Sequence, residues 1–512
     1  MSASFPKPVV ALAVFAGLIA VAVFAQERPD YTKLKAVLSG NVPRTVEEFP
    51  FSAFPIATRS FFDYFMWENF IALMWPSRPQ DHGEPYRPND PAVFRAGYGG
   101  SQNLVPAWMG WMTAYELYPQ DGSTPPAWGD HPSWTPCRGV STSDPRPELI
   151  QITKFTTPVD EFNQAFGGPL FDQAGLLTRY EVRFNRAEYD YVRDNGLYNQ
   201  SNWPTSSGSK PPIFFPASAP DRMGAIEVKA AWRDLTKVDP KWRSRFYTER
   251  ALVVEPDTCT KSSSGRIQDC VCDEMTVGLV GFHIAHKTAK FPQWVWSTFE
   301  QVDNLGEDTP ADMPPSYYNG AHANPADHPG YSYQPEEIQV KQQLHTLRLS
   351  ANANANVQMA GKPVNVTRLS AIPSTPAPDD PSKPSLGPYP TTMVNDTFRK
   401  LAKGTVWENY WLIGTQWSTL PSYPPQSPLR APYLPMNKPS QDFGCEDGTP
   451  AAQGGLAFPE CQVANITMET YHQYDSCQNC HAGAQRSSGE YSWTLVQRAY
   501  NGKGSLTRKA TQ

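Results

Sequence analysis

Two cysteines and a histidine have the side-chain types and spacing that covalent attachment of a prosthetic group requires. Cys477 and Cys480 are three residues apart, and His481 follows directly, in the stretch CQNCH. On a helical turn the two thiols and the imidazole lie on one face. Each thiol can add to a vinyl group of haem to form a thioether, while a ring nitrogen of the histidine binds the iron. The pattern predicts one covalently bound haem c, attached at Cys477 and Cys480, with His481 as the proximal iron ligand.

Three other interpretations compete with haem attachment. A Cys-x-x-Cys redox centre usually follows a strand of a βαβ unit, and residues 464–476 contain no such strand pattern. Half of a zinc site would need a second ligand pair at zinc-finger spacing, which the sequence lacks. The third interpretation is a chance match in an exported protein, with Cys477 and Cys480 joined in a disulfide.

The motif resembles the attachment motif of c-type cytochromes. Together with the stretches at 278–287, 293–300 and 467–471, it makes the chain similar to large single-haem bacterial proteins of the cytochrome c family. The resemblance implies a cofactor attached outside the cytoplasm, but it brings no known substrate. In the small members of that family the motif stands early in its domain, and a downstream methionine commonly supplies the sixth iron ligand. Here only 31 residues, 482–512, follow the motif, and they include neither Met nor His.

The sixth iron position is therefore expected to be open, or filled by water, Lys, Tyr or an upstream residue. His283 and His286 are two candidates, and on a regular strand they would face opposite sides. Met468 and His472 are two more, one or two helical turns before the motif. Because haem potential and reactivity depend on this ligand, the large upstream body is expected to shape the site.

The expected function is that of an exported single-haem, c-type cytochrome-like protein in electron transfer. Its partner would be a redox protein or a small-molecule electron donor or acceptor. One alternative is a haem enzyme, an oxidoreductase or peroxidase-like protein with an open distal site, for which we assign no catalytic acid or base. The other is an exported non-haem binding protein with a Cys477–Cys480 disulfide. The net charge of −6 and the absence of a basic stripe argue against nucleic-acid binding.

Residues 1–25 have the pattern of a secretory signal peptide. Lys7 precedes an unbroken apolar run of 17 residues, Val9–Ala25. That length lies between a signal-peptide core and a membrane span, so an uncleaved N-terminal anchor is the alternative and the only expected membrane contact. The expected location is periplasmic or otherwise exported.

The six other cysteines form an even set suited to three disulfides in an oxidising compartment: Cys137, Cys259, Cys270, Cys272, Cys445 and Cys461. Cys445 and Cys461 bracket a short loop and are expected to pair. Cys259 is expected to pair with Cys270 or Cys272 across a polar hairpin. Cys137 would then pair with whichever of these two cysteines is left.

The expected fold class is α+β, with an antiparallel sheet body, flanking helices and long proline-rich loops, plus a small C-terminal haem-attachment segment. The body would span residues 26–440 and the segment residues 441–512. Four runs rich in β-branched and aromatic residues, with short polar connections, predict the sheet: 225–232, 246–254, 276–286 and 294–302. Helices are expected at residues 60–75, 187–195 and 397–407. The 52 prolines and the polar composition of residues 310–390 predict long surface loops.

Overall fold

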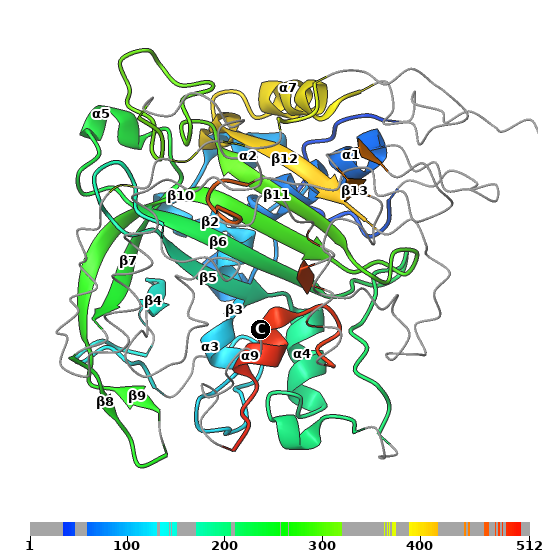
Figure 1. The fold of residues 1–512 in the computed structure, drawn as a ribbon, viewed down its shortest axis with the longest axis vertical. Coiled ribbons are helices and arrows are strands. Elements are labelled where there is room, and N and C mark those ends of the chain that lie inside the picture. The colour runs from blue at the N-terminus through cyan, green and yellow to red at the C-terminus, as the bar shows by residue number, and fades with distance from the viewer. Residues whose placement is uncertain are drawn as a thin grey trace, which may run out of the picture.

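A computed structural model gives the fold of the chain (Figure 1). It describes the following residues: 34–46, 59–130, 134–150 without 143 and 145, 170–319 without 206–209, 256, 257 and 265, 363, 366, 368, 371–374, 389–417, 445, 446, 449, 450, 465–470, 477, 480, 481, 484 and 488–502. Among the helices formed by these residues, none has the length and hydrophobicity needed to cross a bilayer.

An eight-stranded sheet forms the centre of the molecule. Six strands run in the order β12-β11-β10-β6-β5-β3, while β7 pairs with β10 and β4 pairs with β7 (Figure 1). Every pair is antiparallel except β4–β7, which is parallel. The expected α+β class with an antiparallel sheet body is therefore confirmed. The strands of this sheet are β3 (Met112–Thr113), β4 (Glu148–Ile150), β5 (Arg179–Phe184), β6 (Ile226–Asp234), β7 (Thr248–Glu255), β10 (Val271–His286), β11 (Val295–Gln301) and β12 (Tyr410–Gln416).

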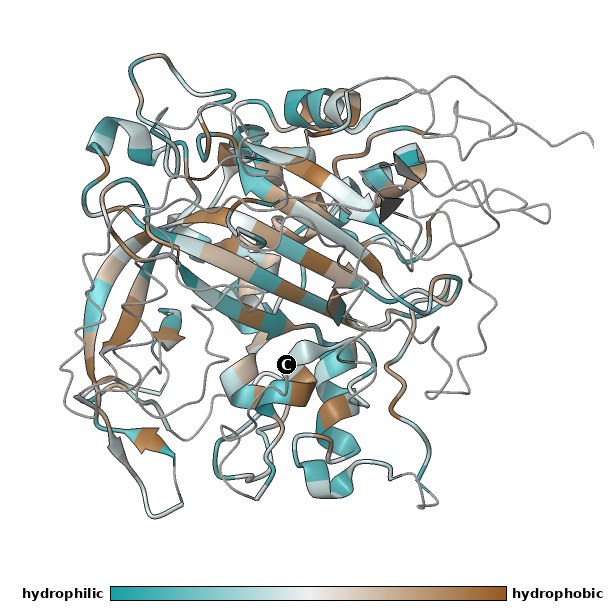
Figure 2. Cartoon of the chain, viewed as in Figure 1, coloured by the Kyte–Doolittle hydropathy of each residue, from teal (hydrophilic) through white to brown (hydrophobic). Residues whose placement is uncertain are grey.

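The four runs predicted as strands correspond to β6, β7, β10 and β11. Hydrophilic and hydrophobic residues alternate along several of these strands, as Figure 2 shows, because successive side chains point to opposite faces of a sheet. β10 is long enough to pair with β7 through its first half and with β6 and β11 through its second half. Three two-residue pairs complete the strands: β1 (Pro76–Ser77) with β2 (Val105–Pro106), β8 (Thr260–Lys261) with β9 (Ile267–Gln268), and β13 (Cys445–Glu446) with β14 (Thr449–Pro450).

The helices are mostly short and lie around the sheet (Figure 1). They are α1 (Arg59–Leu73), α2 (Pro91–Ala96), α3 (Ala114–Leu117), α4 (Arg186–Asp194), α5 (Pro240–Arg243), α7 (Thr391–Leu401) and α9 (Trp493–Arg498), with 3-10 turns η2 (Pro79–Asp81), η3 (Gly100–Gln102), η4 (Ala107–Gly110), η5 (Gln200–Asn202) and η8 (Val406–Asn409). The helices predicted at 60–75 and 187–195 are confirmed as α1 and α4. The one predicted at 397–407 is displaced: α7 begins earlier, after Pro390, and the chain turns at Gly404 (φ 83°) before η8.

The two faces of the sheet have different coverings. One face carries Val228, Phe282 and Phe299, which share a large aromatic core with α1 and α7. The strand registers align Lys229, His283 and Thr298 on the opposite face, with Glu227, Ala285 and Trp296 in the next row. We call this second face the attachment face, because the described residues of the C-terminal segment pack against it.

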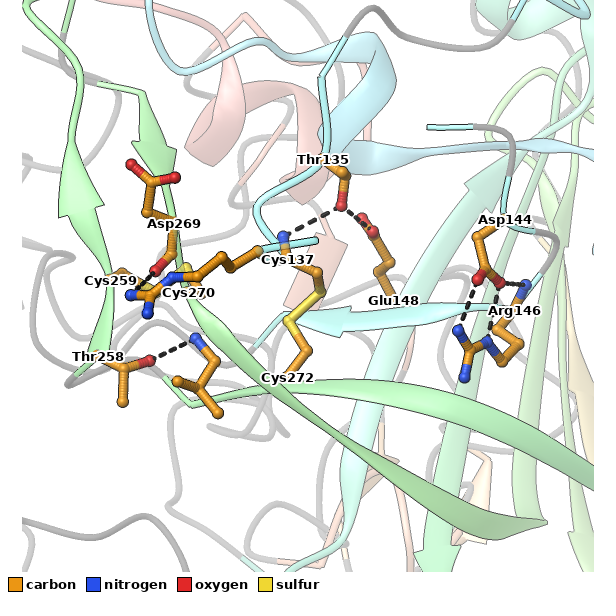
Figure 3. The surroundings of a disulfide bond; sticks show 12 residues. Thr135, Cys137, Asp144, Arg146, Glu148, Thr258, Cys259, Asp269, Cys270 and Cys272 are labelled. Carbon is orange, nitrogen blue, oxygen red and sulfur yellow. Dashed lines mark hydrogen bonds and ion pairs between the residues drawn. A yellow bond between two sulfur atoms is a disulfide. The ribbon is translucent and has the colours of Figure 1, made fainter. Parts of the chain in front are cut away.

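Two disulfides hold the far end of β10 (Figure 3). Cys259 bonds to Cys270, and Cys137 bonds to Cys272. The expectation that Cys259 pairs with Cys270 or Cys272, and Cys137 with the other, is confirmed. The predicted Cys445–Cys461 bridge and the signal-like residues 1–25 lie outside the described residues and side chains.

Candidate functional site

The motif lies in helical turns that two neighbouring elements fix in place. Cys477, Cys480 and His481 are helical and half-buried. The backbone N–H of Cys477 donates to Gln416 Oε1 at the end of β12, at 2.8 Å. The carbonyl oxygen of Cys480 accepts from Trp493 Nε1 in α9, at 2.9 Å. The central sheet therefore holds Cys477 through β12, and the C-terminal helix α9 holds Cys480.

The ring of His481 is oriented by a backbone carbonyl. Its Nδ1 lies 2.6 Å from the carbonyl oxygen of Tyr491, and because a carbonyl can only accept, Nδ1 carries the hydrogen. Nε2 then keeps its lone pair, which is the arrangement that a metal-binding histidine requires. Burial lowers the pKa of His481 to about 4, with nearby His283 and Lys229 lowering it further against the effect of the Tyr491 carbonyl. The imidazole is therefore neutral at neutral pH.

The loop that supplies this carbonyl has unusual backbone geometry. Ser488, Glu490 and Tyr491 have φ values of 67°, 45° and 70°, a region that costs roughly 1–2 kcal/mol for each non-glycine residue. Two tertiary contacts hold the loop in this shape: Glu490 pairs with the buried Lys287, and Ser492 Oγ donates to Glu227 Oε2 at 2.8 Å. Strained backbone that surrounding contacts hold in place is common at functional sites.

Apolar side chains surround the motif. The ring of Trp296 lies 4.2 Å from the ring of His481, measured between centroids. Cys477 packs against a cluster that also contains Ala484 and Leu495. Two thiols on helical turns, a neutral imidazole whose Nε2 keeps its lone pair and an apolar surrounding are the features that a covalently held porphyrin needs. The residues present fit haem c.

Polar side chains lie next to this apolar cluster on the attachment face. His283 and Lys229 are paired across β10 and β6, and the charges of both act on His481. Nε2 of His283 is 2.8 Å from Glu469 Oε1, although the two groups are not aligned for a hydrogen bond. An imidazole, an ammonium and a carboxylate therefore gather beside the predicted proximal ligand.

The structure separates the four candidates for the sixth iron ligand. His283 lies on the attachment face, whereas His286 points to the opposite face, as the strand period predicted. There Nδ1 of His286 is 2.9 Å from Asn69 Oδ1 in α1, and Nε2 is 2.7 Å from Ser218 Oγ. Met468 is buried in another apolar cluster, with Tyr180 and Val280. His472 lies outside the described residues.

Several residues that build the site were missed by sequence reasoning. Glu227 and Lys229 alternate with Ile226 and Val228 on β6, and this pattern ordinarily places the charged pair on a solvated face. That face is instead covered by the C-terminal segment. The carbonyl of Tyr491 has no signal in the sequence at all, because any residue type could supply it.

Neither a protein-family model, nor a curated protein, nor a solved structure matches this chain.

Proposed function

We propose that the chain is an exported, single-haem, c-type cytochrome-like protein that takes part in electron transfer. Cys477 and Cys480 would hold one haem covalently, and His481 would bind its iron. The observation that carries this proposal is the hydrogen bond from His481 Nδ1 to the Tyr491 carbonyl, which fixes the tautomer needed for a proximal ligand. A bound haem would supply a one-electron redox couple.

The protein's own residues would orient the site and exclude water. The side chains of Gln416 and Trp493 form hydrogen bonds with the backbone of Cys477 and Cys480, respectively. Trp296 packs against the imidazole, and the apolar cluster around it lowers the local dielectric. Low dielectric and solvent exclusion are two of the factors by which a protein tunes a haem potential.

Export is the second part of the proposal. The two disulfides of the structure are of the kind that persists in oxidising compartments, and residues 1–25 have the pattern of a signal peptide. Covalent haem attachment outside the cytoplasm, which the family resemblance implies, agrees with both. Cell fractionation of the tagged chain, with the expected recovery in the periplasm, tests this part.

The test of attachment is expression in a host that matures haem c, followed by a pyridine haemochrome spectrum and haem staining of a denaturing gel. We expect one covalent haem per chain, and a marked loss of stain in Cys477→Ala and Cys480→Ala. The matched control is the double variant Cys259→Ala/Cys270→Ala, which removes two thiols elsewhere and should keep its haem. Unstained wild-type protein, or haem that acid acetone extracts, would contradict the proposal and favour a non-haem binding protein with a Cys477–Cys480 disulfide.

A haem enzyme is the second candidate function, and the polar group on the attachment face favours it. His283, Lys229 and Glu469 could exchange protons with a small oxidant or organic substrate at an open iron position. Carbon monoxide binding to the ferrous protein separates the two functions. A spectral shift with carbon monoxide favours an open site, whereas an unchanged spectrum favours a six-coordinate electron-transfer protein. In the latter case, loss of six-coordination in His283→Ala would identify the sixth ligand.

A further inference from the structure

Two carboxyl groups lie together beneath the C-terminal segment. Glu188 of α4 is fully buried, and within the described part of the chain no N–H or hydroxyl donor reaches either of its oxygens. The half-buried Glu227 of β6 lies within hydrogen-bond reach of it. A carboxylate cannot donate, so the two groups bond only when one of them holds a proton. Burial, and then the charges of Glu227 and Glu490, raise the pKa of Glu188 well above its ordinary range, which makes Glu188 the donor and Glu227 the acceptor.

Glu227 is also bonded directly to the segment that orients the proximal ligand. Its Oε2 accepts from Ser492 Oγ at 2.8 Å, and its Oε1 accepts from Thr494 Oγ1 at 2.6 Å. Ser492 follows Tyr491, whose carbonyl accepts from His481. A charge on Glu227 is therefore separated from the imidazole by only a short, fixed stretch of protein.

The surroundings contain more acids than bases. Lys287 is fully buried and forms an ion pair with Glu490. If all three carboxyl groups were ionised, the two cations Lys287 and Lys229 would leave one uncompensated negative charge in a region of low dielectric. The hydroxyl of Tyr118, which faces both Glu188 and Glu227, is buried and has no hydrogen-bond partner among the described residues. An unpartnered polar group beside a carboxyl pair indicates a place where a proton is held.

The titratable groups that face Glu227 are Glu188 of α4, Tyr118 after α3 and Lys229 of β6. Lys287 after β10 and Glu490 of the C-terminal segment face Glu188, the other member of the pair, and Tyr491 faces Glu490. Burial opposes a negative charge on Glu227, whereas the hydroxyls of Thr494 and Ser492, the charge of Lys229 and the hydrogen bond from protonated Glu188 favour it. Glu227 is the less buried member of the carboxyl pair, since Glu188 is fully buried.

On the premise that the haem is attached as proposed, we propose that Glu227 is a proton-binding site coupled to haem reduction. When one electron from the redox partner reaches the haem, the added negative charge favours the neutral form of Glu227. One proton then passes from hydronium in the solvent to Glu227: an O–H bond of hydronium breaks, an O–H bond on Glu227 forms, and water is released. Oxidation of the haem returns the electron to an acceptor and the proton to solvent. The net charge of the buried region is thereby kept constant through the redox cycle.

Potentiometric titration of the haem-loaded protein at several pH values tests this coupling. In the wild type we expect a pH window in which the midpoint potential falls by about 59 mV for each tenfold decrease in proton concentration, the limit for one proton per electron. Glu227→Gln should abolish this slope, because the amide cannot titrate. Glu188→Gln should retain it, because the amide still donates to Glu227.

The matched control is Glu148→Gln. Glu148 of β4 is a carboxyl group whose pKa burial raises to about 7, but it accepts from Thr135 beside the Cys137–Cys272 disulfide (Figure 3), on a strand that pairs with β7. Its replacement should leave the slope unchanged. A slope that survives in Glu227→Gln would assign the proton to another group, such as a haem propionate, and would overturn the proposal.

A second measurement covers the case in which Glu227→Gln does not fold. Reduction of the wild type in weakly buffered solution with an indicator dye should take up to one proton per haem from solvent within the same pH window. A stained, haem-loaded protein with no uptake and a flat potential would overturn this proposal alone. A protein without covalent haem would overturn the proposed function, and this inference with it.

Discussion

At the level of single residues, the two histidines of β10 illustrate how burial decides chemical role. His283 stands among charged groups on the attachment face, beside the predicted haem ligand. His286 is fully buried against α1, where hydrogen bonds to Asn69 and Ser218 use both ring nitrogens. Burial lowers the pKa of His286 to about 3. His286 therefore connects α1 to the sheet as a neutral residue.

Acid should weaken the fold through this residue. Because the folded pKa of about 3 lies below the unfolded value of 6.5, the stabilisation is present above pH 6.5 and is lost as the pH falls toward 3. Each pH unit in that window costs about 1.4 kcal/mol. We expect the free energy of unfolding in urea to fall between pH 7 and pH 5 in the wild type. In His286→Gln, whose side chain does not titrate, this fall should be about 2 kcal/mol smaller. His82→Gln, a change in a surface loop, is the control, and equal losses in all three proteins would contradict the assignment.

At the level of elements, the strands were predictable because their signal is local. Alternating apolar residues identify β6, β7, β10 and β11 wherever they lie in the fold. The bounds of α7 were not predicted correctly: the helix begins after Pro390 and ends at Leu401, and the turn after it passes through Gly404 at positive φ, which a helical pattern does not reveal. The attachment face was not predictable either. Glu227 and Lys229 look solvated on β6, and only the tertiary position of Ser492 and Thr494 covers them.

The two disulfides at the end of β10 should contribute unequally to stability. Cys137 and Cys272 are 135 residues apart in sequence, whereas Cys259 and Cys270 are 11 apart. Loop-closure entropy predicts about 5 kcal/mol for the long loop and about 3 kcal/mol for the short one. We therefore expect Cys137→Ala/Cys272→Ala to lower the free energy of unfolding by about 2 kcal/mol more than Cys259→Ala/Cys270→Ala. Chemical denaturation of both double variants measures the difference, and the reverse order would rule out loop length as the main factor.

At the level of the whole molecule, the C-terminal segment is fastened to the sheet at several points. Asn465 Nδ2 donates to Thr298 Oγ1 at 2.6 Å, and Tyr180 OH donates to the carbonyl of Thr467 at 2.8 Å. The carboxylate of Glu490 meets Lys287 at the other end of the same face. The described residues of the segment and the sheet therefore form one packed unit.

Gly281 lies where the sheet and the C-terminal segment approach each other closely. A β-carbon at this position would lie 2.0 Å from Thr467 Oγ1, so Gly281→Ala must displace the segment. We expect a loss of about 1–3 kcal/mol in the free energy of unfolding and faster proteolysis of the C-terminal segment. Addition of Thr467→Ala should recover part of the loss, because the next atom, Thr467 Cβ, is 3.3 Å away.

The control for this prediction is Gly278→Ala. Its added carbon would lie 2.9–3.0 Å from the two methyl groups of Leu235 and from Phe246 Cβ. These approaches are longer than the 2.0 Å at Gly281 and involve no residue of the C-terminal segment, so the loss should be smaller and the segment should stay protected. Proteolysis of the segment at the same rate in both variants would show that Gly281 has no special role in docking it.

The segment also follows, in the direction of translation, the body residues that hold it. Glu227, Lys287 and Gln416 have all been synthesised before Cys477, and the parts of a chain made first generally fold first. The motif can therefore dock only after the sheet that receives it has been made. A message truncated by a stop codon just before Cys477 would produce a sheet whose face around Trp296 has lost its cover, an apolar surface of the kind that proteases and chaperones detect.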